Sequence, residues 1–198
     1  NEHNFYNSFN FKQKIVIIDS SGIKKNHDLL KKKTSINFNK AIITHTYEKS
    51  DIQIIFGVND SKFDKQKHRI ISTSICDAVA IGPVVSVLNK EFKITSGSIL
   101  TLHPWLGYQN LTDGPSRSFA YPGEIIENFS LGRASNEALI PKKTSCVSAI
   151  TSVIPELKNK FVSMSVRVPT PIVSSAIINL NFIKKIDYSK LSSLFRKV

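Results

Sequence analysis

The sequence lacks several features that are typical of particular protein classes. Two cysteines among 198 residues are too few for a disulfide scaffold, and they fit a reduced, cytosolic setting. No run of about 18 apolar residues occurs, which argues against a membrane-spanning helix. No Gly-x-Gly-x-x-Gly stretch occurs, so the glycine-rich turn that cradles a dinucleotide pyrophosphate is lacking. The chain as a whole is 41% hydrophobic and 21% charged, which is the composition of an ordinary globular protein.

The beginning of the chain lacks an initiator methionine. It starts at Asn1, and its first residues do not have the pattern of a signal peptide. This start predicts a processed or excised piece of a longer protein. Residues 1–13 are polar and aromatic without a period, and we expect them to form a leader outside the fold.

Acidic residues are few relative to basic ones, which gives a net charge of +12. Such a charge invites a nucleic-acid interpretation. The lysines are dispersed along the chain, however, and no basic helix, Cys/His finger or Arg-aromatic RNA motif accompanies them. The charge therefore favours a solvated surface, and a polyanion-binding site stays open as the alternative.

The first third of the chain alternates strand and helix patterns. Residues 14–19 form a short apolar run that is typical of a strand buried on both faces, and a Ser-Ser-Gly turn follows. A polar stretch over residues 24–33 predicts a helix with Leu29 and Leu30 facing inward. Three more strands are predicted at residues 40–44, 52–56 and 69–72. This rhythm predicts a parallel α/β segment.

The rest of the chain has a different pattern. Cys76 opens a predicted helix that runs to Phe92, with an apolar face made of Val79, Val84, Val87 and Leu88 and a disturbance at Gly82-Pro83. A strand over 94–102 ends at His103, and a long loop over 104–132 follows. A helix at 144–154 and strands at 162–168 and 173–182 complete the pattern. We therefore predict an α+β domain with a mixed, largely antiparallel sheet.

Several short motifs follow one another along the chain in the order that a known family has. They are Ser20–Gly22, Phe56–Asn59, Ile71–Cys76, Leu100–His103, Thr112–Ser116, Gly132–Ser135, Leu139–Pro141, Pro155–Leu157 and Arg167–Pro171. Each is weak by itself, but together, from about Lys14 to about Phe182, they resemble the glyceraldehyde-3-phosphate dehydrogenase family.

The resemblance implies an organisation and an activity. Residues 14–74 would be the C-terminal part of a Rossmann-like NAD-binding domain, and residues 75–198 a catalytic domain, with both domains incomplete. The full-length protein would be a cytoplasmic homotetramer of glycolysis that oxidises a phosphorylated sugar aldehyde with NAD. Ser21 and Gly22 lie where the family contacts the cofactor.

The resemblance also assigns the reacting groups. Cys76 lies at the position of the catalytic thiol, which forms a thiohemiacetal and then a thioester, and His103 at that of its base. A strand-to-helix junction favours the thiolate form. Taken alone, such a cysteine is usually a small buried hydrophobe and such a histidine is usually structural. Cys146 has no matched role and is interpreted as a core or helix residue. The other histidines show no metal-ligand spacing.

Anion-binding residues are carried over in the same way. Arg167 resembles the arginine of the substrate phosphate site, and Arg133 with Thr144 resembles part of the inorganic phosphate site. A guanidinium grips phosphate bidentately, but an arginine at the start of an Arg-Val-Pro strand could equally hold a loop by bonding carbonyl groups.

Four positions depart from the family pattern. Ile75 and Asp77 replace the family's Ser and Thr beside the cysteine, and Leu106 and Tyr108 replace two threonines after the histidine. Asp77 places negative charge beside the expected thiolate and phosphate, although an aspartate in a first helical turn is also stabilising.

Two hypotheses about the function follow from these departures. One is a divergent dehydrogenase with a changed substrate or acyl acceptor, in which phosphate or water resolves the thioester. The other is a non-catalytic assembly or polyanion- and RNA-binding module.

Overall fold

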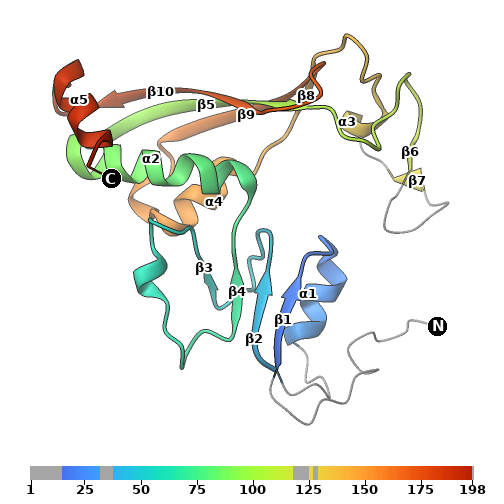
Figure 1. Cartoon of the computed structure of the whole chain (residues 1–198), viewed down its shortest axis with the longest axis horizontal. Coiled ribbons are helices and arrows are strands. Elements are labelled where there is room, and N and C mark those ends of the chain that lie inside the picture. The colour runs from blue at the N-terminus through green and yellow to red at the C-terminus, as the bar shows by residue number, and fades with distance from the viewer. Residues whose placement is uncertain (1–14, 32–37, 118–124, 127–128, 198) are drawn as a thin grey trace. The chain divides into compact units, whose positions relative to one another are not determined.

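The computed structural model describes residues 15–31, 38–117, 125–126 and 129–197 (Figure 1). The predicted leader over residues 1–13 lies outside the described residues. The chain divides into two compact units. The first contains the chain up to Glu91 together with Ser148–Lys158, and the second contains Phe92–Val147 together with Asn159–Val198.

A parallel sheet organises the first unit. Its strands are β1 (Ile15–Asp19), β2 (Phe38–Ile43), β3 (Ile52–Gln53) and β4 (Ile70–Ser72), in the spatial order β1-β2-β4-β3. All three strand pairs are parallel. Helix α1 (Lys24–Lys31) follows β1 in the chain. These elements confirm the predicted parallel α/β segment.

The core of this sheet lies where α1 and β2 present apolar side chains to each other. Leu30 is buried there and Leu29 packs against the cluster, as predicted. The other members are Phe38, Ala41, Ile43, Tyr47 and Ile70, with Ile15 and Ile17 packed against them.

The prediction that residues 14–19 are buried on both faces was wrong. Val16 is 55% exposed and Ile18 is 67% exposed. Strand β1 is at the edge of the sheet, and only the face that carries Ile15 and Ile17 packs on the core. A run of four apolar residues does not reveal whether one face or both are covered.

Helix α2 (Cys76–Phe92) has the predicted bounds but a different apolar face. Its buried apolar side chains are Ala78, Ile81, Val85, Leu88 and Phe92, whereas Val79 is exposed and Val84 and Val87 are half-buried. The helix continues through Pro83. At the neighbouring position, an added Cβ on Gly82 would lie 3.3 Å from two carbons of Ile55, so this residue allows a close approach.

Two hydrogen-bonded links complete the first unit. Helix α4 (Cys146–Val153) is tied to β3, because Gln53 Nε2 donates to Ala149 O at 2.9 Å and to Ser152 Oγ at 2.7 Å. The short helix η3 (Pro155–Leu157) is tied to α2, because Asn89 Nδ2 donates to Glu156 Oε1.

A mixed sheet organises the second unit. Its strands are β5 (Ile94–Pro104), β8 (Ile140–Lys142), β9 (Phe161–Val168) and β10 (Ser175–Phe182), in the spatial order β10-β5-β9-β8. The β5–β9 pair is parallel and the other two pairs are antiparallel. This arrangement confirms the predicted mixed, largely antiparallel sheet.

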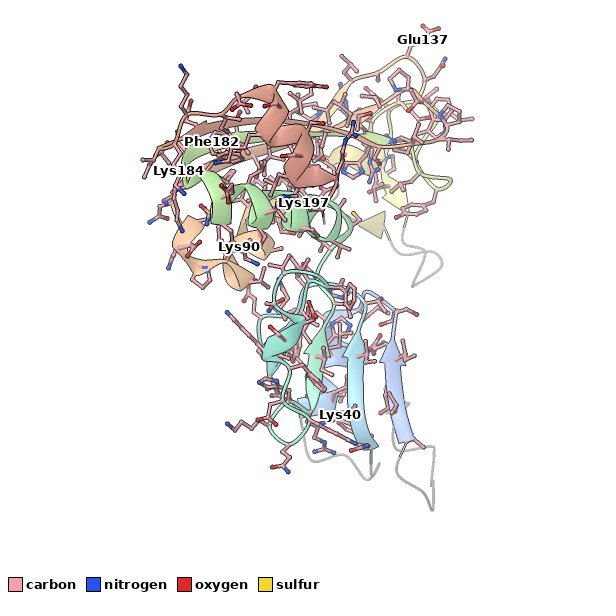
Figure 2. All side chains as sticks on the ribbon, turned by 60° about the vertical axis from the view of Figure 1, so that its left-hand side comes forward. Lys40, Lys90, Glu137, Phe182, Lys184 and Lys197 are labelled. Atoms are coloured by element: carbon pink, nitrogen blue, oxygen red, sulfur yellow. The ribbon has the colours of Figure 1, made fainter. Side chains whose placement is uncertain are left out.

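The end of β10 carries Phe182 (Figure 2), whose ring meets Phe92 edge to face with 5.9 Å between the centroids. After it comes helix α5 (Tyr188–Phe195), which begins behind the N-cap Asp187. The Asp187 side chain accepts a hydrogen bond from Lys190 N at 2.7 Å.

Several short elements were not predicted. The stretch over 104–132, predicted as a loop, contains β6 (Ser116–Arg117), β7 (Ile125–Ile126) and α3 (Phe129–Gly132). The strand β8, the 3-10 helix η2 (Asp60–Lys62) and the helix α5 were also missed. Apart from α5, which has eight residues, these segments have two to four residues and carry no measurable period, so they are specified by their partners rather than by their own pattern.

Candidate active site

The chain before Cys76 is anchored to the carboxyl ends of the parallel strands. Thr73 N and Thr73 Oγ1 donate to Ile43 O, at the end of β2, at 2.9 and 3.3 Å. Ser72 Oγ, at the end of β4, donates to His45 O at 2.7 Å. These bonds fix the direction in which the backbone leaves the sheet and enters α2.

Ser74, two residues before Cys76, has strained backbone geometry. Its φ is 69° and its side chain is buried. A residue other than glycine in this left-handed region costs on the order of 1–3 kcal/mol, and such residues gather at functional sites. The Ser74 N–H donates to Ser72 Oγ at 3.3 Å, which helps to hold the strained turn.

Cys76 itself is the first residue of α2, and its thiol is exposed. Its Sγ lies 3.9 Å from Asp77 Oδ1, so the protonated thiol can donate a weak hydrogen bond to this carboxylate. The start of α2 therefore places the thiol next to an acidic side chain.

Cys146 provides the contrast within the same chain. It is fully buried at the first position of α4, and its backbone N–H donates to Thr144 Oγ1 at 3.1 Å. This confirms the interpretation of Cys146 as a core and helix residue. Both cysteines are free thiols.

His103 is buried in β5 of the second unit, where it is the register partner of Arg167 on β9. Its Nδ1 lies 3.2 Å from Ser174 Oγ. The residue before this serine, Val173, has a φ of 65°, which is a strained conformation for a β-branched residue. Nothing in the sequence indicates Ser174, because this residue lies outside the quoted motifs and a positive φ at the preceding valine is not expected from its residue type.

Arg167 bonds a backbone carbonyl group in this structure. Its Nη1 donates to Pro104 O at 2.9 Å, so it ties the end of β5 to β9. This contact corresponds to the loop-holding alternative considered from the sequence. Arg167 and His103 are nevertheless neighbours across one strand pair, so the structure brings these two predicted site residues together.

Arg133 and Thr144 each make local contacts. Arg133 Nη1 lies 3.2 Å from Asp113 Oδ2, and its guanidinium lies 5.3 Å from the centre of the Phe129 ring. Asp113 Oδ1 also accepts from Ala134 N at 2.8 Å. Thr144 holds the start of α4 through the bond to Cys146 described above. Asp113 belongs to the Thr112–Ser116 motif, but its ion pair with Arg133 was not predicted.

Ser21 and Gly22 form an exposed turn at the carboxyl end of β1. Asp19 Oδ1 accepts hydrogen bonds from Ser21 N at 2.9 Å and from Ser21 Oγ at 2.6 Å. Ser21 Oγ in turn accepts from Ile23 N at 3.2 Å and from Asn26 Nδ2 at 3.1 Å, at the start of α1. The turn is therefore held by a small network of side-chain hydrogen bonds.

The same turn fits one part of a dinucleotide site. Gly22 has a φ of 70°, and an added Cβ would meet nothing within 4 Å, so its backbone is open to a ligand. Parallel α/β sheets bind ligands outside the carboxyl ends of their strands, which is where this turn lies. The chain before Cys76 leaves the same edge of the sheet, with β2 between β1 and β4.

The described ranges contain neither a metal-ligand cluster nor a membrane-spanning helix. No three His, Cys, Asp or Glu side chains in this part of the chain are grouped so that they could hold a metal ion. No helix there is both long and apolar enough to cross a membrane.

Known proteins match most of the chain. The family model described as glyceraldehyde 3-phosphate dehydrogenase, C-terminal domain, matches residues 75–198. The glyceraldehyde-3-phosphate dehydrogenase of Geobacillus stearothermophilus is 28% identical over 181 residues, which are 91% of this chain and 51% of the relative. The corresponding protein of Mycolicibacterium smegmatis is 35% identical over 156 residues, 79% of this chain and 43% of the relative.

A yeast relative gives the same picture. Glyceraldehyde-3-phosphate dehydrogenase 1 of Kluyveromyces marxianus is 29% identical over 183 residues, 92% of this chain and 52% of the relative. The chain thus spans about half the length of the curated relatives that it matches. Because the family model covers more than half of the sequence, the chain belongs to the glyceraldehyde-3-phosphate dehydrogenase family.

Proposed function

We propose that the whole protein is an NAD-dependent aldehyde dehydrogenase that oxidises a phosphorylated sugar aldehyde through a covalent intermediate on Cys76. The observation that carries the proposal is the exposed Cys76 thiol at the first position of α2, two residues after the strained Ser74, in a chain of this family. Buried cysteines are common as small hydrophobes, whereas an exposed one at a helix start is available to a substrate.

The proposed reaction begins at the thiol. Cys76 Sγ attacks the aldehyde carbon, an S–C bond forms, and the carbonyl oxygen takes a proton to give a thiohemiacetal. NAD, when bound, supplies the acceptor for the hydride that leaves the former aldehyde carbon. Loss of that hydride and of the hydroxyl proton leaves a thioester on Cys76. Attack by phosphate or water then breaks the S–C bond and restores the thiolate, which takes up a proton.

His103 is the proposed base. It takes the proton of the thiol and later returns a proton at the substrate oxygen. Ser174 Oγ, 3.2 Å from Nδ1, supports this role because it orients the imidazole. The mechanism requires the Cys76 thiol and the His103 imidazole to meet in the whole protein.

Anion recognition is assigned to arginines. Arg167, the neighbour of His103, is proposed to bind the substrate phosphate, and Arg133 with Thr144 the attacking phosphate. To bind the anion, Arg133 must give up its ion pair with Asp113. Phosphate therefore has to compete with this carboxylate for the guanidinium, which weakens its binding there. Together with Ile75, Leu106 and Tyr108, this supports a substrate or acyl acceptor that differs from the family's usual one.

Self-association is also proposed. One face of the mixed sheet carries the exposed apolar residues Val162, Met164 and Ile177. The register places Leu100 opposite both Met164 and Ile177, so these side chains form one apolar patch. Such a patch supports a homo-oligomer, including a tetramer. The need for a free thiol fits a cytoplasmic location.

The experiment that tests the catalytic proposal is trapping of the intermediate. The whole protein is mixed with NAD and a phosphorylated aldehyde, and the Cys76 peptide is analysed by mass spectrometry. We expect the mass of an acyl group on Cys76 in the wild type and no acylation in Cys76→Ser. An unmodified Cys76 peptide in a protein that binds NAD would remove the proposal.

Thiol reactivity gives a second readout that needs no substrate. Alkylation of Cys76 as a function of pH should change in His103→Asn if the imidazole assists the thiol. Cys146 is the internal control, because its buried thiol is alkylated only when the fold opens. Identical pH profiles in the two proteins would contradict the role proposed for His103.

A further inference from the structure

The rings of His27, His45 and Tyr47 form a cluster in the first unit, in which His27 and Tyr47 are buried and His45 is half-buried. His27 of α1 is fully buried, and its ring centroid lies 4.4 Å from that of His45 and 5.4 Å from that of Tyr47. Within the described residues, neither ring nitrogen of His27 has a hydrogen-bond partner, and neither does Nε2 of His45. His45 Nδ1 lies 2.7 Å from Thr46 O. Unpartnered buried polar atoms are uncommon and call for an explanation.

Asp19 lies between this cluster and the turn. Its Oδ2 is 3.6 Å from His27 Nε2, beyond hydrogen-bonding distance, whereas its Oδ1 holds the Ser21 backbone and hydroxyl. The carboxylate is itself buried. One carboxylate therefore faces a buried imidazole with one oxygen and an exposed turn with the other.

The charges around His27 determine when it takes up a proton. Burial lowers its pKa, and this effect exceeds the opposing attraction of Asp19 from β1 and of Asp28 from its own helix. His45 also lowers the pKa of His27. Asp28 is already engaged by Lys49 Nζ at 2.8 Å and by Tyr47 Oη at 2.9 Å. His27 is therefore neutral at neutral pH, and Asp19 is the nearest carboxylate to the charge that forms on acidification.

We propose that Asp19 is a positioning residue for the Ser21–Gly22 turn, and that protonation of His27 weakens its hold on that turn. A charged imidazole and a carboxylate bond at about 2.8 Å, so Oδ2 must approach Nε2 by several tenths of an ångström. Because both oxygens belong to one planar carboxylate, we expect this move to shift Oδ1 as well and to weaken the two hydrogen bonds that Oδ1 accepts from Ser21. The functional part of this inference rests on the proposed function, in which the turn contacts NAD.

An NMR titration of the isotopically labelled chain tests the coupling without any ligand. We expect the backbone amides of Ser21 and Gly22 to shift with the same midpoint as the His27 ring, below the ordinary histidine value of about 6.5. Asp19→Asn should move the His27 midpoint to lower pH and abolish the shift at Ser21. His68→Gln is the matched control: His68 Nδ1 accepts from Asp64 N at 3.0 Å, outside the cluster, and its loss should change neither midpoint.

The wild-type titration decides the question even if a variant fails to fold. Constant Ser21 and Gly22 amide shifts through the titration of His27 would overturn the proposal. In the whole protein, NAD affinity should weaken by about fivefold on acidification through the His27 midpoint, the lower end of the usual coupling between two sites. His27→Gln should remove this pH dependence, and an affinity that is equally pH-dependent in that variant would also overturn the proposal. Absence of acylation at Cys76 would remove the proposed dehydrogenase activity but leave the NMR coupling intact, so the two failures are distinguishable.

Discussion

In the mixed sheet of the second unit, the buried hydroxyls of Thr101 and Ser165 bond each other at 2.9 Å, whereas in the first unit the buried imidazole of His27 has no hydrogen-bond partner within the described residues. A buried polar group that is left unpaired costs about 1–3 kcal/mol. The strands of the mixed sheet all fall within residues 75–198, the part matched by the family model, and Asp19, His27 and His45 lie outside it. The mixed sheet thus pairs these two buried hydroxyls, whereas the parallel α/β unit leaves a buried imidazole without a hydrogen bond.

The largest expected effect comes from Phe92, which is fully buried against Phe182 with Lys190 Nζ 5.2 Å from its ring centre. Phe92→Ala should lower the free energy of unfolding of the second unit by about 3–5 kcal/mol, since it leaves a large cavity. Native-state hydrogen exchange should show the loss in β5, β9 and β10.

Phe56→Ala is the control for this substitution, because Phe56 is 83% exposed and its loss should change stability by less than about 0.5 kcal/mol. Exchange in β1, β2 and β4 should not respond to Phe92→Ala. An equal loss of protection in both sheets would mean that the two units unfold as one, and the comparison between them would lose its basis.

A smaller effect is expected at Gly97 in β5. An added Cβ would lie 2.7 Å from Leu180 Cδ2 and from Phe161 Cε1, and 2.9 Å from Asn179 O. Because one of these atoms belongs to the backbone, Gly97→Ala should destabilise the sheet by about 1–3 kcal/mol, as measured by chemical denaturation. Gly107→Ala, where nothing lies within 4 Å, should be close to neutral. Equal effects of the two substitutions would show that the sheet is less tightly packed at β5 than these distances indicate.

Much of the frame could be predicted from the sequence, because its signals are long and periodic. The bounds of α2 followed from a helix-length apolar pattern after Cys76, and β5, β9 and β10 from runs of seven or more residues. The predicted faces were less accurate. Val16 and Ile18 were expected inside, and Val79 was expected on the buried face of α2, yet all three are exposed. The pattern of a segment fixes its type, but the neighbouring elements determine which of its faces is covered.

Residues of the candidate site could be predicted only where they belong to a motif that resembles the family. Cys76, His103 and Arg167 came from ordered motifs that resemble the family. Ser174 lies outside these motifs, and Asp113 lies inside one of them, Thr112–Ser116. The contacts of these residues with His103 and Arg133 were not predicted, since the partners lie more than fifteen residues away in the chain. Polar contacts of this kind can be identified only from the structure, because the fold brings the two partners together.

The smallest expected effect is an acid sensitivity that is confined to the first unit. Burial lowers the pKa of His27 in the folded state, so the unfolded chain binds the proton more readily. The contribution of His27 to stability is complete above the unfolded value of about 6.5 and is lost as the pH falls from there through the lowered folded pKa. Hydrogen exchange in β1 and β2, measured at neutral pH and in mild acid, should show this loss, and His27→Gln should remove it. If β5 and β9 lose protection over the same pH range, or if His27→Gln keeps the sensitivity, then the acid response does not originate in the buried imidazole. The edge of the parallel sheet would then differ from the mixed sheet in its hydrogen bonding but not in its response to protons.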